Sequence, residues 1–449
     1  MTMGKDFIAF VLEALVAGFY VAITRGLAPI FFAIYGMDLA EILKINFVAH
    51  LVALVFAWVF YTLREVMLGG GLKLKLLLLH GFERLVWGSI PFVALYHPDL
   101  LYAVYSLAVV STAPVGIMIN VALNSSLDVD TVKRAQVYRT ALGSVSTVVG
   151  QLVSIIVVAS IEGAGKYVLL YAIAMGVGLV STAVLSAASI GGFTPRESGE
   201  EEGVEAAKAS TAFLFLTLII ASGAVLGVSW GPYLVSSLGA EEYIAVALGL
   251  AQTVTSVGAS VFWTSRSYRV YRYAVAILPA VPLAITFARA PLLHIAIAAL
   301  YSFANVGANL LASFIFAEAA KRYSIDKASA MLGSAFILAQ VVGVGVAYLA
   351  SAHGAHALFA VSSVFAGLSL AIAFLAIPEV AVAPPHLALI YAAQIHSSAT
   401  TAYNLAISTA RGYAILSAKI LAFALALAIL YTAFRLLYYF VQFLAGALP

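Results

Sequence analysis

Charged side chains lie inside several long apolar runs of this 449-residue chain, and they are its strongest candidates for chemistry. The clearest are Glu13, Arg25 and Glu83, each inside a long run made mostly of apolar residues. An ionisable group at the middle of a membrane costs about 2.5 to 3.5 kcal/mol on insertion scales, so it is rarely retained without a role. These three residues therefore predict where a functional site lies.

Arg25 has two interpretations, which stay open from the sequence alone. It lies in the middle of its apolar run, just before Gly26 and Pro29. A guanidinium is a rigid fork of donors that suits a carboxylate or phosphate, which favours an anionic substrate or a substrate with an anionic end. The other interpretation is a structural ion pair with Glu13 or Glu83, neither of which lies at helical contact spacing from Arg25.

Glu13 and Glu83 are also the candidates for proton coupling, because a buried carboxylate can exchange a proton near working pH. Arg84 follows Glu83 directly, and adjacent residues on a helix point to different sides. We therefore expect no pair between these two. His80 is expected to be a satisfied packing residue and not a proton relay.

The second half of the chain offers neutral polar groups instead. Trp230, Gln252, Asn305 and Asn309 lie inside apolar runs. Such groups could line a cavity for a solute of sugar or metabolite size. They could equally bridge helices by hydrogen bonds, which are worth about 0.6 kcal/mol each within a membrane.

Several functional classes find no support in the sequence. There is no Walker loop, no Gly-x-Ser-x-Gly and no His-Glu-x-x-His motif, so we predict neither ATP drive nor an enzyme. The formal charge of +3 is small and scattered, which argues against nucleic acid as a partner. With no cysteine and no cluster of metal ligands, no metal or cofactor is predicted.

Composition indicates which elements must hold these residues. Apolar side chains make up 63% of the chain and charged ones 10%, a balance that a soluble domain of this length could not keep in solution. A membrane core about 30 Å thick needs about 20 apolar residues per helix. Twelve runs meet that length: 7–35, 45–62, 76–95, 100–123, 141–161, 167–190, 212–238, 243–264, 273–289, 292–316, 328–350 and 357–377.

Loop charges predict the orientation. Lys and Arg residues gather in alternate loops, and basic residues collect on the cytoplasmic side of a membrane. The N-terminus and the polar insert 191–208 are therefore expected in the cytoplasm, in a multi-pass protein of the cell membrane. Membrane lipid is its expected surrounding.

The two sets of six runs repeat each other in order. Pro29 and Gly36 in the first run recur as Pro232 and Gly239 in the seventh, with the same seven-residue spacing. The motif 141–144 (Ala-Leu-Gly-Ser) recurs as 331–334 (Met-Leu-Gly-Ser). Internal repeats are a recurring design in secondary transporters.

Twelve spans in two sets of six, with a cytoplasmic insert between them and small-residue-rich fifth and eleventh spans, resemble the major facilitator superfamily. The resemblance covers 7 to about 377 and implies an all-α polytopic membrane protein with two six-helix bundles. It also implies that the helix carrying Arg25 lines a central cavity. Members usually carry a glycine–aspartate–arginine–glycine–arginine loop after the second span, whereas loop 64–75 here has glycines and basic residues but no aspartate.

The domain prediction has four parts: a bundle at 1–190, a cytoplasmic linker at 191–208, a second bundle at 209–378 and a C-terminal appendage at 379–449. The appendage is predicted to hold an interfacial helix at about 387–410 and a thirteenth transmembrane helix at 413–448, that is, one or two extra helices.

The leading functional hypothesis is a secondary transporter that moves a small organic solute by alternating access, and the solute is anionic under the first interpretation of Arg25. An alternative is a non-transporting membrane subunit or anchor that reuses the fold and binds a protein partner through the C-terminal helices. A lipid-linked saccharide flippase is less favoured, because the second half contributes almost no intramembrane charge.

Overall fold

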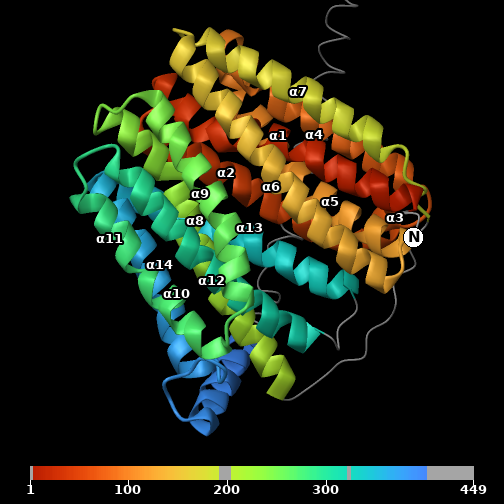
Figure 1. Ribbon diagram of the computed structural model, residues 1–449, viewed down its shortest axis with the longest axis vertical. Helices are drawn as coiled ribbons and strands as arrows, with labels where there is room; N and C mark the ends of the chain where they lie inside the picture. Colours follow the sequence, from red (N-terminus) through yellow and green to blue (C-terminus); the bar gives the residue numbers. More distant parts are fainter. Residues whose placement is uncertain (1–3, 192–203, 321–324, 402–449) are drawn as a thin grey trace, which may run out of the picture. The chain divides into compact units, whose positions relative to one another are not determined.

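The computed structural model of the protein describes residues 4–191, 204–320 and 325–401. Within these ranges the chain is helical and contains twelve helical spans that are long and apolar enough to cross a membrane. The predicted number of spans is confirmed for this part of the chain, and the protein is a multi-pass membrane protein (Figure 1).

The first six spans are the long helices before the polar insert. They are α1 (Lys5–Ile34), α2 (Leu39–Thr62), α4 (Leu72–Tyr96), α5 (Leu101–Ser126), α6 (Val129–Ser160) and α7 (Gly165–Leu185), with the short α3 (Arg64–Leu68) and η1 (Pro98–Leu100) between them.

The last six spans begin with α8 (Val204–Ser236) and α9 (Glu242–Thr264). The next span, predicted as one run, consists of η2 (Tyr268–Val270), α10 (Tyr271–Ile277) and α11 (Ala280–Phe287). Pro279 and Pro282 lie at the break, where neither can donate a backbone hydrogen bond. The set ends with α12 (Leu293–Ala320), α13 (Ile325–Ala350), η3 (Ser351–His353) and α14 (Ala355–Ala376).

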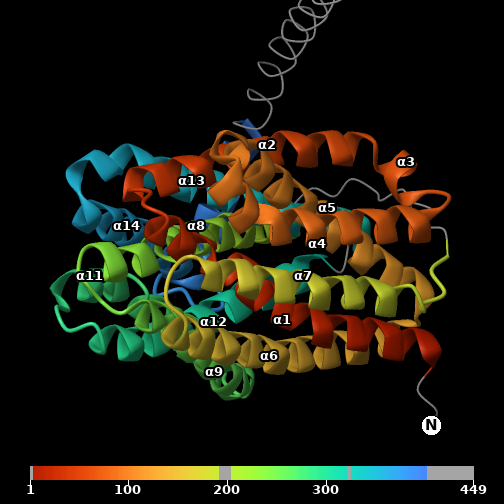
Figure 2. The ribbon, with the colours of Figure 1, turned by 90° about the horizontal axis from the view of Figure 1, so that it is seen from above.

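Helices α1 and α8 lie at the centre, each in contact with helices of both sets. Around them, α2 packs beside α13 and α6 packs beside α9, and these two pairs form the larger part of the contact between the sets (Figure 2). The α1–α8 contact needs a residue without a side chain, because a Cβ added at Gly231 would lie 2.9 Å from Ile30. Small residues permit this close approach of helices in a membrane.

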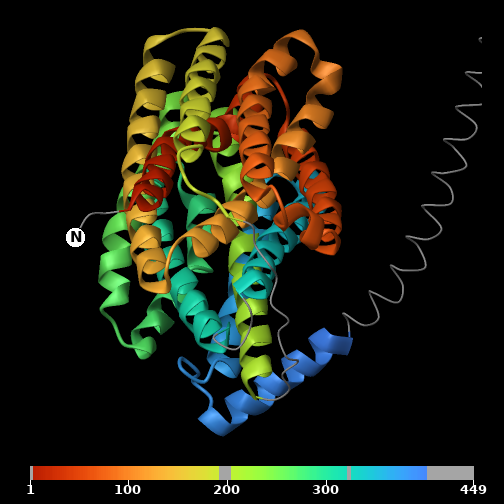
Figure 3. The ribbon, with the colours of Figure 1, turned by 90° about the vertical axis from the view of Figure 1, so that its right-hand side faces the viewer.

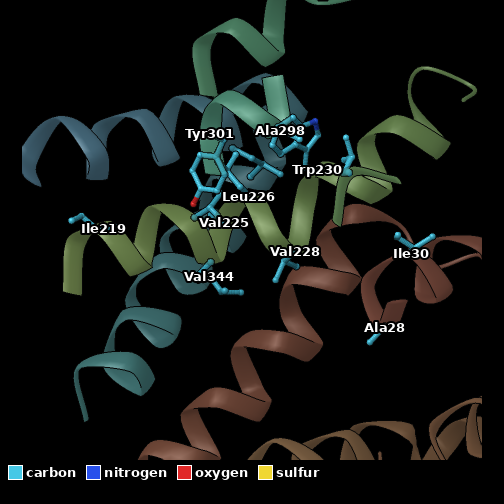
Figure 4. Close-up of a cluster of buried hydrophobic side chains, with 14 of the residues drawn as sticks. Ala28, Ile30, Ile219, Val225, Leu226, Val228, Trp230, Ala298, Tyr301 and Val344 are labelled. Carbon is cyan, nitrogen blue, oxygen red and sulfur yellow. The ribbon is translucent and has the colours of Figure 1, made fainter. Parts of the chain in front are cut away.

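One apolar core extends through both sets. Ile30 of α1, Val228 of α8 and Val344 of α13 belong to the same cluster of buried side chains (Figure 4). The red-to-yellow helices of the first set and the green-to-blue helices of the second can be followed separately in Figure 3. Dispersion contacts and helix–helix packing stabilise such a core, because the surrounding lipid is as apolar as the protein interior.

Successive spans run in opposite directions, so the ends of α1 and α8 and the starts of α2, α7 and α9 lie at one end of the bundle, here called the α1–α2 end. Polar contacts join the two sets there. Lys166 Nζ lies 2.9 Å from Glu242 Oε2, and the Tyr167 hydroxyl donates to the same oxygen at 2.8 Å. Phe47 and Tyr348 stack near this end with ring centroids 6.5 Å apart.

The segment after α14 is tied to the opposite end of the second set. Arg272 Nε donates to the Val380 carbonyl at 2.7 Å, and Lys208 Nζ lies 3.3 Å from Glu379 Oε1. A further helix begins at residue 385 and continues to 401, within the predicted interfacial segment. The predicted thirteenth helix at 413–448 lies outside the described residues.

Candidate functional site

Glu83 is the first of two carboxylates around which charged side chains gather. It is fully buried on α4, and its Oε1 lies 2.5 Å from Arg25 Nη2 of α1. Its other oxygen, Oε2, contacts Arg84 Nη1. The pair that we did not expect between adjacent residues thus forms, and that prediction is wrong. The side chain of Arg84 is long enough for its guanidinium to reach back to its neighbour although the two Cβ atoms point apart.

Glu13 is the second carboxylate, on α1 and equally buried. Arg139 Nη1 of α6 lies 2.9 Å from Glu13 Oε2, close enough for an ion pair although the angle is wrong for a hydrogen bond. On the other oxygen, Oε1, His80 Nε2 lies at 3.3 Å and Arg84 Nη2 at 3.8 Å. Arg84 and His80 therefore connect the two carboxylates.

The six residues form one group, here called the charge cluster: Glu13, Arg25, His80, Glu83, Arg84 and Arg139. Its buried centre depends on a glycine of α7, because a Cβ at Gly178 would lie 2.9 Å from Arg84 Cδ and 2.8 Å from Tyr20 Cδ2. The Arg84 guanidinium lies over the Tyr20 ring, 4.3 Å from its centroid. Aromatic and glycine surfaces thus hold this cation in one position.

The charge cluster carries an excess of positive charge. Three guanidinium groups face two carboxylates, so one positive charge remains even when His80 is neutral. Two cations at its ends are partly exposed: the side chain of Arg25 is 33% exposed and that of Arg139 is 15% exposed. A partly exposed guanidinium in a cluster that carries excess positive charge is suited to bind an anion.

Arg25 lies beside open space. Gly26 is exposed although the residues at 22–24 and 27–32 are buried, and no heavy atom lies within 4 Å of a Cβ added to it. Gly227 on α8 is likewise exposed and open, inside a buried stretch at 224–234. The two central helices therefore each have one uncovered position near the middle of the span.

The second set has a neutral counterpart. Trp230 of α8 is buried, and its indole N–H donates to His294 Nδ1 of α12 at 3.0 Å. His294 Nε2 lies 3.0 Å from the Ala288 carbonyl. Both ring nitrogens of this histidine thus have uncharged partners, and Trp230 has its hydrogen bond within the protein.

The amides predicted in the second set lie on two helices that pack together, α9 and α12. Asn309 Nδ2 donates to the Asn305 carbonyl at 2.8 Å and lies 3.0 Å from Asn305 Oδ1. Ser302 Oγ donates to the backbone carbonyl of Gln252 at 2.6 Å. All three predicted amides are half-buried, and their role in substrate binding stays a prediction.

The structure brings together Arg25, Glu13 and Glu83 but places Trp230, Gln252, Asn305 and Asn309 on other helices. Sequence reasoning missed the part that Arg84, His80 and Arg139 play in the cluster. A count of acidic and basic residues could have identified them, because two acidic residues inside the membrane require basic partners, and those partners come from the same half of the chain. Among the described residues, no three His, Asp or Glu side chains gather into a group that could hold a metal ion.

The arrangement of helices is that of the major facilitator fold. Among solved structures, a mutant of the nucleoside transporter NupG matches with a TM-score of 0.58 and 14% identity, over 83% of this chain and 98% of that one. A bacterial homologue of the iron transporter ferroportin, in an inward-facing state, matches with a TM-score of 0.60 and 11% identity, over 83% and 98%.

A bacterial homologue of the human lysosomal transporter Spinster, in an inward-facing and occupied conformation, matches with a TM-score of 0.54 and 11% identity, over 88% of this chain and 96% of that one. No protein-family model matches the chain, and no curated protein matches it significantly. At these identities the likeness establishes the fold.

Proposed function

We propose that the protein is a secondary transporter that moves a small anionic organic solute across the cell membrane by alternating access. The observation that carries the proposal is the position of Arg25. This cation belongs to a buried cluster with excess positive charge, is one-third exposed, and lies beside the open position at Gly26.

The donors of Arg25 are only partly used. Nη2 pairs with Glu83, whereas the buried Nε has no hydrogen-bond partner in the protein. A carboxylate or phosphate oxygen would reach this guanidinium from its exposed side, since one-third of the side chain is exposed. The Arg25 guanidinium carbon lies over the ring of Trp87, 5.7 Å from the ring centroid. This ring limits how far the cation can move.

Alternating access is supported by the contacts at the α1–α2 end. Lys166, Tyr167 and Glu242 join the two sets there. Loop charges predict that this end is extracellular and that the N-terminus is cytoplasmic. We assign the described conformation to an inward-facing state, closed on the outside, which agrees with the inward-facing states of two of the structures that it resembles.

The remaining predicted residues have parts in this proposal. Gln252, Asn305 and Asn309 would line the wall opposite Arg25 and contact the neutral portion of the solute. Trp230 would position α8 through His294, since its indole N–H is engaged. Glu13 and Glu83, the candidates for proton coupling from the sequence, lie in the same cluster as Arg25, so a proton bound within this cluster and an anion bound at Arg25 would interact directly.

The proposed domains are the bundles 1–190 and 209–378, joined by a cytoplasmic linker at 191–208 and followed by an appendage at 379–449. In the alternative, the chain is a membrane subunit that binds a protein partner through that appendage and moves no solute. The two functions differ in whether the folded protein binds a small anion at Arg25.

Thermal unfolding of the purified protein in lipid nanodiscs tests the proposal. Phosphate and a panel of mono- and dicarboxylates are screened against wild type, Arg25→Gln and the control Arg266→Gln, whose cation is exposed and lies over the Phe262 ring outside the cluster. An anion that binds the folded state raises the melting temperature in proportion to its occupancy.

We expect at least one anion to stabilise wild type and Arg266→Gln but not Arg25→Gln. Proteoliposomes that contain wild type or Arg266→Gln should take up that anion, and those that contain Arg25→Gln should not. If no anion stabilises wild type and Arg25→Gln lowers the unliganded melting temperature outright, Arg25 is a structural ion pair and the membrane-subunit alternative is favoured.

A further inference from the structure

His80 is the fully buried residue at the centre of the charge cluster. Its Nδ1 lies 2.7 Å from Thr182 Oγ1 of α7. Its Nε2 faces two partners of opposite kind, Arg84 Nη2 at 2.8 Å and Glu13 Oε1 at 3.3 Å. A single nitrogen thus lies between a cation that can only donate and a carboxylate that can only accept.

The shorter contact determines the protonation state of the ring. A guanidinium has no acceptor, so Nε2 must offer its lone pair to Arg84. The ring proton is then on Nδ1 and is donated to Thr182, whose hydroxyl lies 3.4 Å from the Gly178 carbonyl and can donate onward. His80 is therefore neutral in the described state, with its hydrogen on Nδ1.

Adding a proton at Nε2 would exchange the partners. The new N–H would donate to Glu13 Oε1, and the contact with Arg84 would become a repulsion between two donors and two positive charges. Arg84 has an alternative partner in place, because its Nη1 already contacts Glu83. The step has a clear balance: one proton is gained, one hydrogen bond to Arg84 is lost and one to Glu13 is formed.

Charge couples this step to Arg25. With a neutral His80 the cluster holds one excess positive charge, and a proton on His80 would make it two. Buried charge of one sign is costly unless it is compensated. A monoanion bound at Arg25 would return the excess positive charge to one, so a bound anion favours the binding of the proton. By linkage, a bound proton then favours the binding of the anion by the same free energy.

We propose that His80 is the proton-binding site of the transporter, and that the protein carries its anion together with a proton. This inference rests on the proposed anion site at Arg25. The charged and titratable groups that face the ring or surround it are Glu13 and Tyr20 of α1, Glu83 and Arg84 of α4 and Arg139 of α6.

Proton uptake on anion binding tests the proposal with the full chain in detergent. Lactate, which stays a monoanion near neutral pH, is added to the protein in weakly buffered solution with a pH-indicator dye, and binding is followed in parallel by thermal shift. Three proteins are compared: wild type, His80→Gln and His294→Gln. The last removes a histidine that is equally buried but has only the neutral partners Trp230 and Ala288.

Wild type and His294→Gln should take up about one proton per chain when the anion binds, since a single ring nitrogen is the acceptor. His80→Gln should still bind the anion through Arg25 but lose this uptake. Equal proton uptake by His80→Gln and wild type overturns the proposal. Absence of any anion-induced thermal shift in wild type argues against the proposed anion site instead.

A second measurement needs no anion. Nitrogen-15 spectra of histidine-labelled protein, at about pH 8 where an ordinary imidazole is neutral, report which ring nitrogen carries the hydrogen. The His80 signals are those that disappear in His80→Gln. We expect the Nδ1–H form for His80 and the Nε2–H form for His294, and an Nε2–H form for His80 contradicts the proposal.

Discussion

His80 and His294 are both fully buried histidines of this protein, one in each set of spans, and their surroundings differ in kind. His80 lies among arginines and glutamates, whereas His294 bonds to the Trp230 indole and a backbone carbonyl. The two sets of helices thus have interiors of opposite kind. The first holds charges that can exchange partners, and the second holds a neutral network with its partners satisfied.

The repeat between the sets is therefore one of backbone and not of chemistry. Gly36 after α1 and Gly239 after α8 adopt φ values of +101° and +63°, which L side chains rarely adopt. Pro29 and Pro232 lie inside the same two helices. The glycine turn and the proline position recur, while the side chains that face the interior differ. We infer that the ionic chemistry belongs to the first set.

The largest expected effect comes from removing the cation at the centre of the charge cluster. Arg84→Met leaves Glu83 with Arg25 alone and His80 without its donor, which should destabilise the protein by about 3 to 5 kcal/mol. The double variant Arg84→Met/Glu83→Gln should recover most of this loss. Thermal unfolding measures both, and equal melting temperatures for Arg84→Met and wild type contradict an ionic interior in the first set.

A substitution on α7 sharpens the comparison without changing any charge. Gly178→Ala places a Cβ within 3 Å of Arg84 and Tyr20 and should cost about 1 to 3 kcal/mol through overpacking. Gly176→Ala, on the same helix, meets no heavy atom within 4 Å and is the matched control. It should keep or slightly raise the melting temperature, and a similar loss in both variants would show that Gly178 has no special part.

The neutral network should respond less than the charged one. Trp230→Phe keeps an aromatic side chain but leaves His294 Nδ1 without its hydrogen-bond donor. This should lower the free energy of unfolding by about 1 to 2 kcal/mol. Thermal unfolding in detergent measures this loss beside that of Arg84→Met. A loss for Trp230→Phe as large as that for Arg84→Met would remove the distinction drawn between the two sets.

The smallest effect on stability is expected where the sets meet, at the pair Lys166 and Glu242. Glu242 is 25% exposed, so Lys166→Met should cost about 1 kcal/mol or less after screening by solvent. The conformational equilibrium should still shift, because this contact joins the two sets at the α1–α2 end.

Spin labels can report that shift, since the native chain has no cysteine. Glu162→Cys and Glu241→Cys place labels at exposed positions of the two sets near this contact. Lys166→Met should lengthen their separation relative to the labelled parent. An unchanged distance would show that the pair does not stabilise the closed end.

Much of the fold could be predicted from the sequence. The described residues contain the twelve expected spans because a membrane demands about 20 apolar residues per crossing, a signal that is local and strong. The break in the ninth span was missed, although Pro279 and Pro282 mark it. Local signals of this kind do not depend on which helices become neighbours.

The candidate site could be predicted only in part. Glu13, Arg25 and Glu83 stand out because charge inside an apolar run is rare. The sequence could not identify their partners, because these lie far apart along the chain. Arg139 is 126 positions from Glu13, and Arg25 could pair with either Glu13 or Glu83. The sequence alone determined that this is a multi-pass membrane protein with twelve spans in its described part and buried charge in the first half of the chain.

Tertiary structure decided the rest. The packing of α1 against α4, α6 and α7 brings three arginines to two carboxylates and places His80 between Glu13 and Arg84. Electrostatic partnership depends on distances of a few ångström between side chains from different helices, and hydropathy along the chain carries no information about such distances.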